Sequence, residues 1–116
     1  MSLVKTVYAQ TTDFPKTELY GLTSQMRRSA VSVPSNIAEG AARETTPEFL
    51  RFLYIARGSL AELETQLLIA HALGYIDNAE SLKAEIYQVS ALLDGLIRSL
   101  KARSPRVKEE DPLYVE

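Results

Sequence analysis

Residues 49–74 read FLRFLYIARGSLAELETQLLIAHALG, and this stretch decides the fold. Its apolar residues recur at alternating steps of four and three, which places them on one seam of a helix: they are Phe49, Leu53, Ala56, Leu60, Leu63, Leu67 and Ala70. A β-strand, whose side chains alternate with a period of two, cannot produce this spacing. Such a helix is about 40 Å long and needs neighbours of similar length. The sequence therefore predicts a helical bundle.

Both ends of this helix carry boundary signals. Thr45 is placed to accept a hydrogen bond from a free N–H of the first turn, and Glu48 is placed to complete a capping box with it. Pro47 suits the first turn, where its missing N–H is not needed. Gly74 follows the last turn and can adopt the left-handed conformation that ends a helix. These signals predict both helix ends.

The segment before this helix predicts two more helices. Residues 3–12 form a short one, and residues 16–42 form a longer one. The inner stripe of the longer helix comprises Leu19, Leu22, Met26, Ala30, Val33, Ile37 and Ala41. Pro34 interrupts a backbone hydrogen bond within it, but the periodicity continues across the proline. We therefore expect a kink around residues 32–33 and not a break.

A fourth helix is predicted in the last third of the chain. Asp77 is placed to cap it, with Glu80 as the reciprocal partner. Its four-three seam comprises Leu82, Ile86, Val89, Leu93, Leu96 and Leu100. We expect a four-helix bundle domain over residues 1–103, followed by a flexible C-terminal tail over residues 104–116.

Short connections between long helices favour antiparallel neighbours. The predicted fold is therefore all-α, an antiparallel up-down-up-down four-helix bundle with a short first helix and a proline-kinked second helix. The first helix is too short to cover the other three along their length. We expect that either the start of the chain is shortened or another subunit covers the gap.

Composition places the chain among ordinary globular domains. It has 116 residues, of which 46% are hydrophobic and 24% charged, enough for one domain with a real core. It contains no cysteine, which excludes disulfides and thiolate metal sites. The net charge of −2 gives no global attraction to nucleic acid or anionic lipid. With no long apolar run and no signal segment, we expect a cytoplasmic protein that does not bind membranes.

The sequence offers little to support catalysis. His71 is the single histidine, and Leu68 three residues before it rules out the Glu-x-x-His unit of di-metal bundles. None of the five glycines forms a phosphate-binding loop. We therefore expect no enzymatic activity, no cofactor, no metal and no small-molecule substrate.

Arginines on the second and third helices have two interpretations. Arg27 and Arg57 flank the apolar seams, and Arg28 and Arg51 lie nearby on the same helices. In the first interpretation they form boundary salt bridges between these two helices. In the second they form a patch that binds phosphate groups or a partner, for which the planar guanidinium fork is suited. The sequence leaves both open.

The predicted third helix also has an apolar set on its back. Ile55, Ile69 and Leu73 lie opposite the seam, interleaved with Gly58 and Glu62. A helix that is apolar on two sides needs more neighbours than one bundle supplies. We favour a homo-oligomer interface here, with Gly58 permitting close approach. The alternative is that the first two helices cover this face.

Four sequence blocks resemble one known family. They are YGLTSQMRRSA at 20–30, NIAEG at 36–40, FLRFL at 49–53 and ARGSLAELET at 56–65. In this order they are similar to the four-helix bundle proteins encoded in intervening sequences of bacterial 23S ribosomal RNA genes. The resemblance covers residues 14–100. Related small bundles accompany the reverse transcriptases of diversity-generating retroelements, where they resemble nucleic-acid-binding accessory subunits.

The resemblance implies a left-handed up-down bundle and a ring-shaped homopentamer of unassigned biochemical role, with no catalytic residue to transfer. The matching polar positions include Asn36, Glu39 and Glu64, which we expect to form a structural polar cluster. The leading hypothesis is a non-enzymatic, pentameric scaffold that contacts structured RNA or a nucleoprotein through Arg27, Arg28, Arg51 and Arg57. The alternative is a protein–protein assembly module that binds no nucleic acid.

Overall fold

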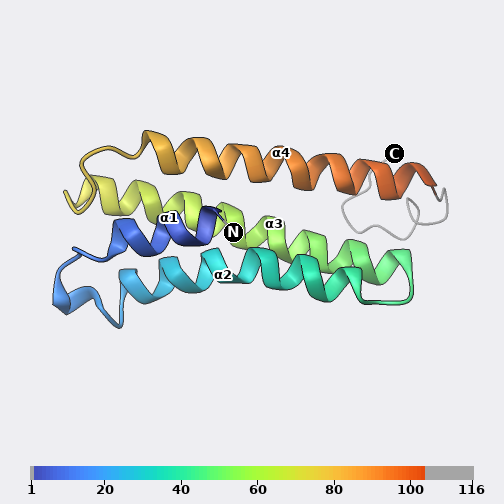
Figure 1. The fold of residues 1–116 in the computed structure, drawn as a ribbon, viewed down its shortest axis with the longest axis horizontal. Helices are drawn as coiled ribbons and strands as arrows, with labels where there is room; N and C mark the ends of the chain where they lie inside the picture. Colours follow the sequence, from blue (N-terminus) through green and yellow to red (C-terminus); the bar gives the residue numbers. More distant parts are fainter. Residues whose placement is uncertain (1, 104–116) are drawn as a thin grey trace.

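The computed structural model describes residues 2–103, and these form four antiparallel helices with no strand (Figure 1). This confirms the predicted all-α fold with a short first helix. The predicted tail lies outside the described residues. In chain order the elements are α1 (Ser2–Thr11), the 3-10 turn η1 (Lys16–Glu18), α2 (Leu22–Ala41), α3 (Thr46–Ala72) and α4 (Glu80–Arg103).

The four helices occupy the corners of a square. α2 packs most extensively against α3, which also packs against α4. α1 lies between α2 and α4, so that within the described part of the chain it is diagonal to α3 (Figure 1). The long axis of the molecule, 48 Å, follows the three long helices. α3 therefore has α2 and α4 as its two neighbours within the bundle.

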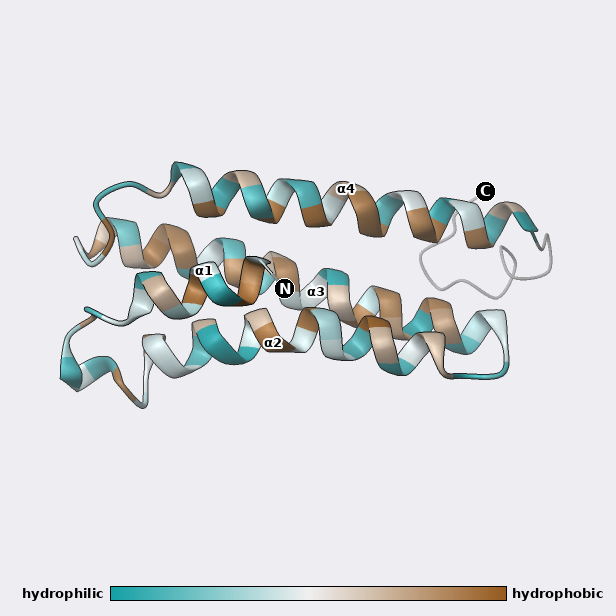
Figure 2. Cartoon of the chain, in the orientation of Figure 1, coloured by the Kyte–Doolittle hydropathy of each residue, from teal (hydrophilic) through white to brown (hydrophobic). Residues whose placement is uncertain are grey.

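The seam of α3 forms the centre of the core. Six of its seven predicted residues are buried, and Phe49 is partly buried against the same cluster. The α4 seam behaves in the same way, with Val89 and Leu96 partly buried and Ile97 added to the core. In Figure 2 the hydrophobic segments of α4 lie mostly along the edge of its ribbon that faces the other helices. The four-three spacing thus identified the packed faces of both helices.

The ends of α3 follow the predicted signals. The Thr45 side chain accepts a hydrogen bond from the backbone N–H of Glu48, and Pro47 stands in the first turn. Gly74 has a φ of +79°, and the N–H groups of Gly74 and Tyr75 return to carbonyls of the last turn. The connection to α4 differs from the prediction, because Asn78 and not Asp77 accepts the hydrogen bond from the Glu80 N–H.

The start of α2 corrects the sequence prediction. The expected helix over residues 16–42 is divided into η1 and α2, because Gly21 between them has a non-helical backbone. Leu19 consequently lies in the turn and is half exposed, and Ala41 at the other end is also exposed. α2 continues unbroken through Pro34, as predicted, whereas the kink itself stays a prediction.

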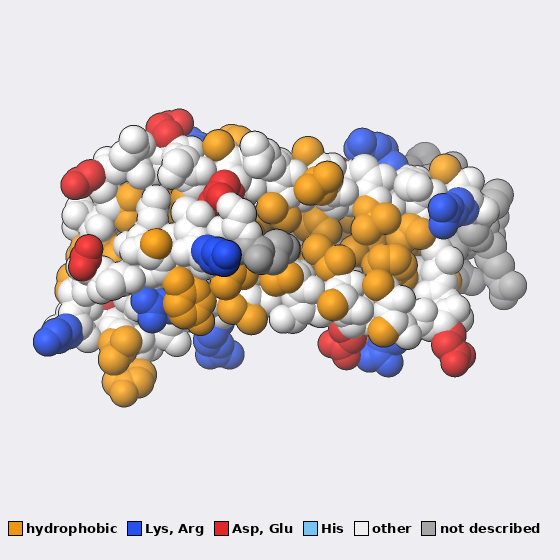
Figure 3. Space-filling model, in the orientation of Figure 1, with side chains coloured by type: hydrophobic (Ala, Val, Ile, Leu, Met, Phe, Trp, Pro, Cys, Tyr) orange, Lys and Arg blue, Asp and Glu red, His pale blue; other side chains and the backbone are white. Residues whose placement is uncertain are grey.

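The two ends of the bundle differ in the number of helices that surround the core. α1 starts beside α4, where the Ser2 hydroxyl donates to the Glu85 carboxylate, and it covers only the end that holds the α3–α4 turn (Figure 1). Beyond it, α2, α3 and α4 continue as three helices. Hydrophobic side chains gather on this surface between α4 and α2 (Figure 3). The partly buried Ile37, Phe49 and Leu96 belong to this three-helix end.

Candidate functional site

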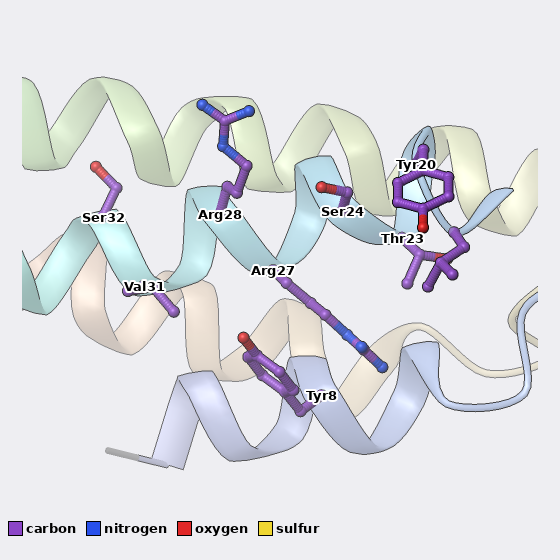
Figure 4. A pocket seen from close by; sticks show the side chains of 9 residues that line it. Tyr8, Tyr20, Thr23, Ser24, Arg27, Arg28, Val31 and Ser32 are labelled. Atoms are coloured by element: carbon purple, nitrogen blue, oxygen red, sulfur yellow. The ribbon is translucent and has the colours of Figure 1, made fainter.

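The four candidate arginines do not form one patch. Arg27 points from α2 toward α1, where its Nε donates to the Thr11 hydroxyl at 2.9 Å. Its guanidinium lies 4.6 Å from the ring centroid of Tyr8 (Figure 4). These two contacts join α1 to α2. Arg27 is thus engaged with α1, whereas the salt-bridge interpretation expected its partners on α3.

Arg57 and Arg51 are engaged on other surfaces. Arg57 forms an ion pair with Asp94 of α4 at 3.6 Å and stacks on Tyr54 at 5.0 Å. Arg51 lies 3.8 Å from a Glu48 carboxylate oxygen and stacks on Phe52 at 5.7 Å. Both ion pairs are solvent-exposed, and such pairs add little stability. The expected α2–α3 salt bridges are thus replaced by contacts within α3 and with α4.

Arg28 differs from the other three. It is exposed on α2, and within residues 2–103 it forms no ion pair or hydrogen bond. It lies where two grooves meet, one along α2 toward α1 and one between α2 and α3. The first groove has a volume of about 580 Å³ and is lined mainly by apolar and aromatic surface (Figure 4). Arg28 is therefore the candidate arginine that is available to a ligand.

The groove along α2 ends at a turn that is held in place. Glu18 of η1 accepts hydrogen bonds from the Leu22 N–H at 3.3 Å and from the Tyr75 hydroxyl at 3.0 Å. The bond to Glu18 is the main reason why the pKa of Tyr75 is raised, with desolvation and the Glu18 charge adding to it. Phe14 packs against the same tyrosine ring, 5.4 Å between centroids. This turn presents Tyr20 with 93% of its surface exposed.

The predicted interface residues lie together on the outer face of α3. Ile55, Ile69 and Leu73 are 42%, 45% and 54% exposed, so α1 and α2 do not cover this face. Gly58 and Glu62 are exposed between them. A Cβ at Gly58 would meet no neighbouring atom within 4 Å. We call Ile55, Gly58, Glu62, Ile69 and Leu73 the α3 stripe.

The three residues of the expected polar cluster bond to different partners. The Asn36 amide donates to the carbonyl and hydroxyl of Ser32, which in turn shares a hydrogen bond with Ser59 of α3. Glu39 pairs with Arg43 at 2.9 Å on the surface. Glu64 lies on α3 in a shallow groove toward α4, beside Arg57. Asn36 thus contributes to the α2–α3 contact, whereas Glu39 and Glu64 lie elsewhere on the surface, so the three do not form one cluster.

The described side chains offer no metal centre. Within residues 2–103 no three His, Asp or Glu side chains converge in a way that could hold a metal ion. His71 is exposed near the end of α3. No helix in the same range is both long and apolar enough to cross a membrane.

Comparison with protein families identifies the chain. The family model of the 23S rRNA-intervening sequence protein matches residues 1–95, most of the chain. The chain belongs to this family. The match agrees with the resemblance carried by the four sequence blocks. No curated protein sequence matches the chain.

Sequence reasoning missed three residues of the groove along α2. Tyr8 and Tyr20 are exposed aromatic residues at the two sides of the groove, and Thr23 is buried with an unpartnered hydroxyl. The signal for Tyr20 was available, because it lies four residues before Ser24 and eight before Arg28. The helix break at Gly21 and the position of α1 were needed to show that they share one groove.

Proposed function

We propose that this protein is a non-enzymatic scaffold that assembles into a homo-oligomer through the α3 stripe. The observation that carries the proposal is the half-exposed state of Ile55, Ile69 and Leu73 along the central helix. Large aliphatic side chains aligned on one exposed face are typical of protein interaction sites. Soluble oligomers are most often closed and symmetric assemblies of one chain. The pentameric ring implied by the family resemblance is the assembly that we expect.

Gly58 gives this stripe a feature suited to close packing. A glycine in a helix interior is unfavourable by about 1 kcal/mol relative to alanine. Space around Gly58 is open, so no contact among the described residues, 2–103, requires a glycine here. A neighbouring subunit that packs closely against the α3 backbone would explain why a residue without a side chain stands at this position. Glu62 beside it provides a charge for the polar rim of such an interface.

The experiment is a mass measurement by light scattering on variants of the stripe. We expect Ile55→Asp combined with Ile69→Asp to convert the oligomer into folded single chains, because two charges would be buried at the interface. Gly58→Leu should have the same effect without adding charge. Leu92→Asp is the matched control, since Leu92 is 74% exposed on α4 and lies away from the stripe. An assembly unchanged by the stripe variants would refute this interface.

RNA contact is a second candidate function, supported by one observation. Arg28 is exposed, unpaired within the described residues and next to an aromatic groove. The contacts of Arg27, Arg51 and Arg57 favour structural roles instead, so that of the four candidates Arg28 alone has no ion pair or hydrogen bond within residues 2–103. Assembly would multiply this weak site, because copies held together bind a long ligand jointly.

A further inference from the structure

Four side chains along the groove are spaced for an extended ligand. Tyr20, Ser24, Arg28 and Ser32 follow one another at four-residue intervals. Each interval from Ser24 onward is slightly more than one helical turn, a rise of about 6 Å. Figure 4 shows Ser24, Arg28 and Ser32 on the same side of α2, with the Tyr20 ring at the end of the row. The row combines an aromatic face, a cation and the Ser24 hydroxyl, whereas the Ser32 hydroxyl is already bonded to Asn36 and Ser59.

The groove also contains a polar atom that lacks a partner. Thr23 is only 3% exposed, and within residues 2–103 its hydroxyl has no hydrogen-bond partner although the residue lines the groove. A buried hydroxyl without a partner is unfavourable, because it has lost its bonds to water. This hydroxyl is closed to solvent, so the hydrogen-bonding capacity that the groove offers to a ligand comes from the Arg28 guanidinium, which is unpaired within residues 2–103. A phosphodiester strand offers acceptors for the guanidinium.

The exposed aromatic ring determines which ligand fits. Tyr20 is 93% exposed, so within the part of the chain that the structure describes its ring is open to stacking. We propose that this groove binds single-stranded nucleic acid, with an unpaired base stacked on Tyr20 and an adjacent phosphate at Arg28. The inference rests on the second candidate function, RNA contact, and specifies the form of the nucleic acid. Base stacking on an aromatic side chain tolerates any sequence.

The charges favour a single strand over a duplex. A duplex buries its bases in its own stack, so a duplex-binding surface relies on several cations that contact phosphates. Here one arginine is free, Arg27 is held by Thr11 and Tyr8, and Glu62 lines the adjoining groove. The chain as a whole has a net charge of −2. Stacking must therefore supply much of the affinity, which gives a shallow dependence on salt.

The test is fluorescence anisotropy with a labelled single-stranded RNA of about 12 nucleotides and with the duplex formed by adding its complement. We expect the single strand to bind more tightly and to lose less than about tenfold in affinity between roughly 50 and 200 mM salt. Tyr20→Ala should weaken it about tenfold, while Tyr20→Phe keeps the affinity. Arg28→Ala should weaken it and lower the salt slope by about one.

A second tyrosine provides the matched control. Tyr87 is 53% exposed on α4 and shares a shallow groove with Arg57, which is already paired with Asp94. Tyr87→Ala should therefore leave RNA affinity unchanged. Because Tyr20 and Tyr87 are both exposed, both variants should fold, which circular dichroism would verify.

The outcomes separate this inference from the proposals on which it rests. Equal binding of single strand and duplex that depends on Arg28 but not on Tyr20 would overturn the inference and leave RNA contact standing. Absence of binding at low salt would overturn both, without affecting assembly through the α3 stripe. If Tyr20→Ala changed the mass of the oligomer, the groove would be a subunit contact, and the inference would be wrong.

Discussion

The two ends of the bundle share three helices and differ in the fourth. At one end α1 covers the core, and Leu3 and Val7 are buried between α2 and α4. At the other end the α2, α3 and α4 seams continue with the same period, but Ile37 and Leu96 remain partly buried. The comparison teaches that the periodicity of a helix fixes which face is apolar. It does not fix how many neighbours cover that face.

The largest expected effect is the loss of stability when a core leucine is shortened to alanine, and this loss should differ between the two ends of the bundle. Leu63→Ala, at a fully buried position of α3 where α1 completes the square, should lower the free energy of unfolding by about 3–4 kcal/mol. Leu100→Ala, near the end of the three-helix part, should lower it by about 2 kcal/mol, because that site has more room to relax. Urea denaturation of both variants measures the difference. Equal losses would contradict the comparison.

An intermediate effect is expected from adding a methyl group at the three-helix end, where α2 and α3 approach each other closely. A Cβ on Gly40 would lie 2.8 Å from the Phe52 Cβ and 2.9 Å from a Phe49 ring carbon. Gly40→Ala should therefore push α2 away from α3 and destabilise the protein by about 1–3 kcal/mol, despite the better helix propensity of alanine. Thermal unfolding followed by circular dichroism measures it. Gly95→Ala is the control, since its Cβ would have space and should be neutral or stabilising.

The smallest expected effect concerns the attachment of α1. Arg27→Ala removes the hydrogen bond to Thr11 and the cation–π contact with Tyr8, with an expected loss of about 1–2 kcal/mol. Hydrogen exchange should show faster exchange in α1 and unchanged exchange in the middle of α3. Arg43→Ala, which removes an exposed ion pair, serves as the control. Uniform acceleration across all helices would mean that α1 does not open separately.

The sequence predicted the central features of the fold because they depend on local chemistry. The α3 seam, the Thr45 cap and the left-handed Gly74 follow from spacing and from backbone preferences. The same reasoning failed at the start of α2, where an apolar residue at the right interval, Leu19, lies in a turn. It also failed for Asp77, because the neighbouring Asn78 supplies the capping oxygen. Where several neighbouring residues could each cap a helix, the path of the chain into the helix decides which one supplies the capping oxygen.

By itself, the sequence determined the four helices, their apolar faces and the exposed stripe on α3, since each is a property of one helix and its period. Only the tertiary structure decided the roles of the arginines. Arg27 and Arg28 are adjacent in sequence, yet Arg27 is held by α1, whereas Arg28 is exposed and lines the same groove as Tyr20. Consecutive residues on a helix point about 100° apart, so they meet different neighbours. Those neighbours are set by the packing of distant segments, which no local pattern contains.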